Sequence, residues 1–100
     1  MADFTKLQTG LPASPVGYEE LAILDTPKFP DRTNVHRCTF AILTLEGGPV
    51  RWLDYGVPTP LFGNLFKEGE TLTLSGAMVR WASFIRTAPT VTTLHLRYYA

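Results

Sequence analysis

The single cysteine, Cys38, is the strongest candidate for covalent chemistry, since His36 stands two residues before it. Catalysis by a thiol needs a histidine base and a third group that orients this base. Residues two apart on a β-strand point to the same side, so the two side chains could meet. Cys38, however, lies in the most apolar segment of the chain, where a thiol usually behaves as a small hydrophobic group. We therefore predict a packing role for Cys38.

Two pairs of acidic residues could supply the two carboxylates of a glycoside hydrolase. Glu19 and Glu20 are adjacent in a strand-like run, so their side chains would point to opposite faces of a sheet. Glu68 and Glu70 flank a glycine in a segment typical of a turn. We interpret all four as solvated surface residues and predict that the protein is not an enzyme.

Metal and phosphate binding find little support in the pattern of residues. His36, Cys38 and His95 lack the paired spacing of zinc motifs. Gly47 and Gly48 precede a proline and not a helix, so no helix N-terminus is available to hold phosphate. We therefore expect no metal and no cofactor.

Aromatic side chains are the remaining candidates for binding. They could form a platform for sugars, fill the core, or cover a subunit interface, and the sequence leaves the three alternatives open. The residues concerned are Trp52, Tyr55, Trp81, Tyr98 and Tyr99.

Charge and hydropathy exclude several classes of protein. Nine basic residues balance nine acidic ones, which argues against a partner made of nucleic acid. No apolar run reaches the roughly 20 residues that span a bilayer, so we expect no membrane partner. The first residues lack a basic stretch followed by an apolar one, so we expect no secretory signal.

The elements that must position these residues are strands. Residues 1–17 are proline-containing and lack a clear period, which predicts an extended N-terminal arm. Residues 18–100 are predicted to form one β-sandwich domain. Its strand-like runs are 18–24, 37–45, 50–53, 70–74, 83–86 and 92–99.

The predicted fold class is all-β, a small antiparallel sandwich or barrel of jelly-roll or immunoglobulin-like type. The run 37–45 is apolar on both faces and is predicted to be a central strand. A turn at 46–49 would lead it into 50–53 as a hairpin. Residues 76–82 could form a single helical turn, and no longer helix is expected.

The segment 50–59, Val-Arg-Trp-Leu-Asp-Tyr-Gly-Val-Pro-Thr, resembles a pattern common in small virion proteins of tailed bacteriophages. In that pattern a strand with Val-Arg-Trp runs into Asp-Asp-Gly, two variable residues and Pro-Thr. Tyr55 departs from it at the second acidic position. The later features that match are Gly63, Gly69, Leu72-Thr73-Leu74, Gly76, Phe84-Ile85-Arg86 and the closing strand 94–99.

The resemblance implies a structural protein of a phage virion, assembled in the host cytoplasm. Such proteins serve as capsid decoration or cement subunits, head fibres, or neck and tail components. We expect a decoration or cement subunit whose partners are the major capsid protein or other virion proteins. A neck, tail or fibre component, or a module that binds carbohydrate on the host surface, is the alternative.

Self-association is a further expectation, with a trimer favoured over a dimer because decoration proteins often occupy threefold positions. The neutral surface and the scarcity of lysines to guard strand edges both favour contact between copies. The residues we predict to face a partner are Phe4, Leu7, Leu11, Trp52 and Tyr55.

Overall fold

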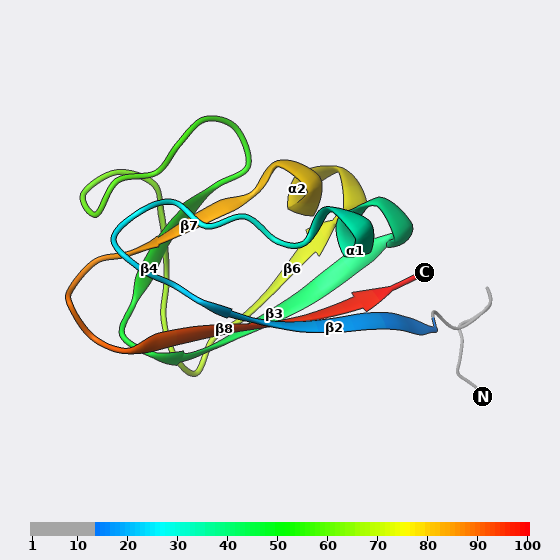
Figure 1. The fold of residues 1–100 in the computed structure, drawn as a ribbon, viewed down its shortest axis with the longest axis horizontal. Helices are drawn as coiled ribbons and strands as arrows, with labels where there is room; N and C mark the ends of the chain where they lie inside the picture. The colour runs from blue at the N-terminus through cyan, green and yellow to red at the C-terminus, as the bar shows by residue number, and fades with distance from the viewer. Residues whose placement is uncertain (1–13) are drawn as a thin grey trace.

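The protein folds into two antiparallel sheets packed face to face, in a computed structural model that describes residues 14–100 (Figure 1). The four-stranded sheet has the order β2-β8-β3-β6, and the three-stranded sheet has the order β5-β4-β7. The strands are β2 (Pro15–Ala22), β3 (Phe40–Gly47), β4 (Val50–Leu53), β5 (Asn64–Phe66), β6 (Thr71–Ser75), β7 (Ser83–Arg86) and β8 (Thr92–Tyr99). The predicted all-β sandwich is confirmed.

Buried and outward-facing side chains alternate along the strands, and the buried ones form the core between the two sheets. On β8, Leu94, Leu96 and Tyr98 are buried, while the residues between them face outward. β3 lies between β8 and β6, as predicted for a central strand, with Leu43 opposite Leu96. The three-stranded sheet adds side chains such as Phe84 to the same core.

The predicted hairpin between β3 and β4 is wrong, because the chain crosses from one sheet to the other. Both edges of β3 are occupied by β8 and β6, so β4 pairs with β5 and β7 instead. Gly47 permits the crossing with φ at 101°. A Cβ atom at Gly47 would lie 2.0 Å from the carbonyl oxygen of Val91, so only glycine fits there.

Two helices of six residues each interrupt the strands: α1 (Arg32–Arg37) and α2 (Gly76–Trp81). α1 was not predicted from the sequence; its first turn is capped by the Asp31 carboxylate, which accepts from Thr33 N at 2.8 Å. His36 therefore lies on a helix, and the same-side argument that placed it beside Cys38 on a strand is wrong. α2 coincides with the helical turn predicted at 76–82.

The first strand begins earlier than expected. β2 starts at Pro15, so residues 15–17, which we had assigned to the arm, pair with β8. Ser14 and Ala100 exchange two backbone hydrogen bonds of 3.0 Å and extend this pairing by one step. The predicted contact residues Phe4, Leu7 and Leu11 lie outside the described residues.

A buried hydrogen bond ties β2, β8 and the start of α1 together. The Tyr98 hydroxyl donates to Glu19 Oε1 over 2.7 Å. Both carboxylate oxygens of Glu19 also accept from the backbone N–H of Asp31, at 3.0 and 3.1 Å. Burial, and then the bond to Glu19, raises the pKa of Tyr98 far above its ordinary value. Glu19 is thus a half-buried structural residue, whereas we expected a solvated one.

Candidate functional site

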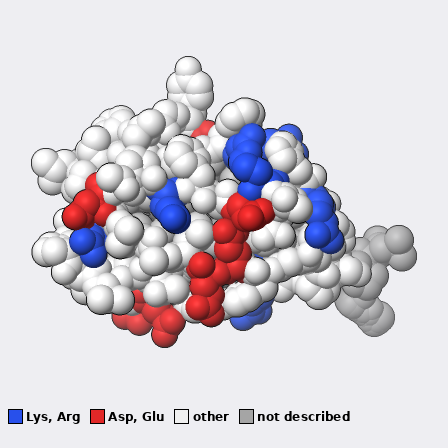
Figure 2. All heavy atoms as spheres, in the orientation of Figure 1, with Lys and Arg blue, Asp and Glu red and all other residues white. Residues whose placement is uncertain are grey.

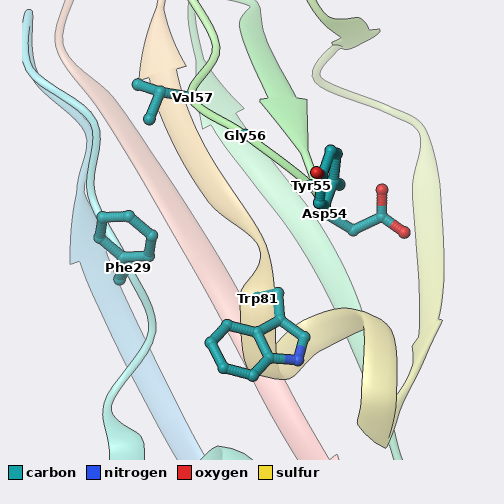
Figure 3. A pocket seen from close by; sticks show the side chains of 6 residues that line it. All are labelled: Phe29, Asp54, Tyr55, Gly56, Val57 and Trp81. Atoms are coloured by element: carbon teal, nitrogen blue, oxygen red, sulfur yellow. The ribbon is translucent and has the colours of Figure 1, made fainter.

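An apolar hollow of about 530 Å³ opens on one side of the sandwich. Three segments that are distant in the sequence line it: the connection from β2 to α1, the connection from β4 to β5, and the end of α2 (Figure 3). The lining residues are Phe29, Asp54, Tyr55, Gly56, Val57 and Trp81.

Phe29 forms the first wall and is held there by the backbone beside it. Lys28 N donates to Phe84 O at 2.8 Å, and Phe84 N donates to Lys28 O at 2.9 Å. These two hydrogen bonds hold the connection between β2 and α1 against the outer edge of β7. Pro27 and Pro30 restrict the backbone dihedrals on either side. The backbone that carries the half-exposed Phe29 ring is therefore held in place.

The second wall is the loop that follows β4. Gly56 adopts a φ of 90°, a conformation that allows the chain to turn after Asp54 and Tyr55. Pro58 is fully buried and anchors the far side of the loop in the core. The loop therefore presents Tyr55 and Val57 to solvent from a backbone attached at both ends.

Trp81 forms the third wall as the last residue of α2. The Arg32 guanidinium lies 5.5 Å from the centre of the Trp81 ring, within the range of a cation–π contact. Arg32 Nη1 also donates to Arg80 O at 3.2 Å, which ties α1 to the end of α2. Trp81 is thus held in position although 60% of its surface is exposed.

The lining of the hollow carries little charge. Figure 2 shows acidic side chains gathered in a stripe across the lower half of this face and basic ones near α1 and α2, whereas the region of the β4–β5 connection is almost uncharged. Asp54 is the one lining residue with a charged side chain. Apolar contact therefore dominates what this surface can offer a ligand.

The two aromatic contact residues predicted in the domain end up in different places. Tyr55 lines the hollow and is 91% exposed. Trp52 is only 8% exposed and packs on Phe84, with ring centres 6.4 Å apart. Because Trp52 lies on β4 with its side chain in the core, it is not available to a partner.

Sequence reasoning did not place Phe29, Val57 or Trp81 at a common site. Trp81 was one of several aromatic residues with three open interpretations, and Phe29 was not considered. The signal for Phe29 was a large aromatic residue between two prolines, in a segment that could not enter a core strand. No sequence signal shows that these three residues converge, because the sheet packing brings them together.

Cys38 packs in the core as predicted. It is buried just past the end of α1, and its thiol donates weakly to Val35 O at 3.5 Å. Burial raises the pKa of the Cys38 thiol above its ordinary value. A catalytic cysteine needs the opposite shift, because the thiolate is the nucleophile.

A polar cluster occupies the outer face of the four-stranded sheet. His95 Nε2 lies 2.7 Å from Glu46 Oε1, and His95 Nδ1 lies 2.7 Å from the Tyr18 hydroxyl. Tyr18 donates to Glu20 Oε2 at 2.9 Å, and this bond raises the pKa of Tyr18. Within residues 14–100, no serine, threonine or cysteine side chain is hydrogen-bonded to His95, so the cluster lacks a nucleophile for its imidazole to activate.

The hollow is the better candidate site, since its fixed aromatic rings can pack on an apolar side chain or on the face of a sugar ring. Across the part of the chain that the structure describes, no three histidine, cysteine or acidic side chains are grouped to hold a metal ion. Over the same part, no helix has the length and hydropathy needed to cross a bilayer. No family model, curated protein or solved structure matches this chain.

Proposed function

We propose that the protein is a non-enzymatic structural component of a tailed-phage virion, a capsid decoration or cement subunit that bridges neighbouring capsid subunits. One observation carries the proposal: the large apolar side chains that line the hollow are each at least half exposed. They are Phe29, Tyr55, Val57 and Trp81.

Such a concentration favours a surface that another protein covers. Soluble monomers rarely expose large contiguous apolar patches, because water solvates them poorly. Here the side chains project from backbone that hydrogen bonds and buried prolines hold in place, so a partner would not have to order them first. A cement subunit works by this kind of contact, repeated by symmetry over a shell.

The resemblance to virion proteins supports the same surface. The segment 50–59 supplies β4 and then the loop with Asp54, Tyr55 and Val57 that lines the hollow. The segment 50–59 thus also carries two of the exposed apolar residues of the hollow, Tyr55 and Val57.

Binding of the protein to purified phage particles that lack it tests the proposal, with occupancy counted in electron micrographs and by quantitative gel. We expect density at symmetry-related positions on the capsid. Trp81→Ala should lower the affinity at least tenfold while the protein stays folded. Val91→Ala is the matched control, since Val91 is an exposed apolar residue outside the hollow. Absence of capsid density, or density confined to the neck or tail, would contradict the cement role.

A second candidate function, binding of host-surface carbohydrate, is favoured by the shared position of Tyr55 and Trp81. Two exposed rings in one hollow can stack on a pyranose ring. Screening the protein against a panel of immobilised glycans separates the two functions. Specific binding that Trp81→Ala abolishes and Val91→Ala preserves would favour the carbohydrate module over the cement subunit.

A further inference from the structure

We propose that the hollow receives the N-terminal arm, residues 1–13, of a second copy of this chain. This inference rests on the proposed structural role, since it describes how copies of such a subunit would join. It assigns an occupant to a surface that the described residues leave open.

The chemistry of the arm matches the chemistry of the hollow. Phe4, Leu7 and Leu11 are large apolar residues of the arm, and the charges of its two charged side chains, Asp3 and Lys6, cancel. The hollow offers three aromatic rings and Val57 with a single carboxylate. Its volume, about 530 Å³, lies in the range of about 300–1,000 Å³ that is usual for binding pockets. One or two of the apolar side chains of the arm could therefore enter it.

The arm is also long enough to reach a neighbour. Thirteen residues in an extended conformation span at most about 43–47 Å. The longest dimension of the molecule is 44 Å. An arm that leaves one subunit can thus reach the hollow of a subunit packed beside it.

The place where the arm joins the domain favours a neighbour over the same molecule. The paired backbone hydrogen bonds between Ser14 and Ala100 fix this junction. In Figure 1 the chain enters β2 at the right-hand end, whereas the β4–β5 connection lies toward the left. An arm that continues the direction of β2 therefore leads away from its own hollow.

The hollow needs little rearrangement to accept an occupant. Phe29 is fixed by the Lys28–Phe84 backbone pair, and Trp81 is fixed by the contact with Arg32. Because the backbone at Phe29 and the ring of Trp81 are already held, the entropy cost of binding would fall mainly on the arm.

Mixing two defective full-length chains tests the proposal. The first carries Phe4→Ser, Leu7→Ser and Leu11→Ser, so its arm is disabled and its hollow is intact. The second carries Trp81→Ala, so its hollow is disabled and its arm is intact. We expect each to be monomeric by sedimentation at concentrations where the unaltered protein assembles. Mixed together they should form a complex of one copy of each, because one arm and one hollow remain to join.

Matched controls separate this contact from general effects of substitution. An arm with Thr5→Ser, Gln8→Ser and Thr9→Ser, and a domain with Val91→Ala, should assemble like the unaltered protein. A synthetic peptide of residues 1–13, added to the arm-disabled chain, should shift the indole N–H signal of exposed Trp81 in NMR spectra. The signal of buried Trp52 should stay in place.

Three results would overturn the proposal: assembly that survives both sets of substitutions, a mixture that stays monomeric, or a peptide that leaves the Trp81 signal unmoved. None of these results depends on capsid binding. The particle assay can therefore contradict the virion role while the mixing experiment supports the arm–hollow contact. The mixing experiment can likewise contradict the contact while the protein still binds particles.

Discussion

Replacing Tyr98 by phenylalanine measures how much one buried hydrogen bond contributes to the stability of the sandwich. Tyr98 is fully buried, and its hydroxyl is 2.7 Å from Glu19 Oε1. Phenylalanine keeps the ring in the core, so the change removes only the hydroxyl and its bond. Hydrogen bonds to charged groups contribute about 1.5–3 kcal/mol. Because Glu19 keeps both contacts with Asp31 N, we expect the lower part of this range, a loss of about 2 kcal/mol.

The loss should be visible in both denaturant and thermal unfolding. In a domain of this size, 2 kcal/mol corresponds to a fall in Tm of about 8–15 °C. The urea midpoint should fall while the slope m stays constant, because the fold and the surface exposed on unfolding are unchanged. Tyr99→Phe is the matched control, since the Tyr99 hydroxyl has no hydrogen-bond partner among residues 14–100, and its effect should stay within about 0.5 kcal/mol.

The same pair of proteins gives a second readout in alkaline solution. The raised pKa of Tyr98 means that the folded protein keeps a proton that the unfolded chain releases near pH 10. The free energy of unfolding of the unaltered protein should therefore fall as pH rises above about 10. Tyr98→Phe lacks this proton. The difference in free energy of unfolding between the two proteins should therefore narrow by up to about 1.4 kcal/mol per pH unit above about pH 10. The stabilising role of the Tyr98–Glu19 hydrogen bond would be refuted if Tyr98→Phe and the unaltered protein had the same free energy of unfolding at pH 7 and showed the same dependence on pH.

Three other substitutions and one chemical treatment test separate parts of the fold. Gly47→Ala should cost about 3 kcal/mol or prevent folding, because positive φ and a steric clash combine there. Gly69→Ala, with φ at 92° but open space, should cost only about 1–2 kcal/mol in the same urea titration. Cys38 should react with a disulfide reagent far more slowly in the native protein than in urea, since it is buried and its pKa is raised; equal rates would contradict its place in the core. Asp31→Ala should remove the cap of α1 and lower the stability by about 1 kcal/mol in thermal unfolding, and an unchanged Tm would show that the cap contributes nothing.

The parts of the fold that follow from local pattern were predictable. β8 shows a clear alternation, which correctly separated buried residues such as Leu96 from their outward-facing neighbours. The run that forms β3 is apolar on both faces, and from this its central place between β8 and β6 was correctly predicted. α1 was not predictable from periodicity, because six residues contain a single buried apolar position, Val35. Its main signal was Asp31 after a proline, a cap that we did not weigh.

Features that depend on the packing of distant segments were not predictable. A Gly-Gly-Pro segment can close a hairpin or carry the chain between sheets, and the choice depends on whether β3 has a free edge. The hollow likewise depends on three connections that meet only in the folded chain. Tyr55 follows β4, and this place in a connection favoured a contact residue. Trp52 lies within β4, two residues after the buried Val50, so its side chain points to the same face and into the core.

The position of β8 has a consequence for how the chain folds. β2 and β8 are the first and last strands along the described chain, yet they are neighbours, and β8 separates β2 from β3. The four-stranded sheet can therefore be completed only after a loop containing most of the domain has closed. We expect this closure to slow folding toward the millisecond-to-second range typical of β-sandwiches. Until β8 is inserted, β2 has no partner strand and β3 has an open edge, so the partly folded chain is the species most prone to aggregate.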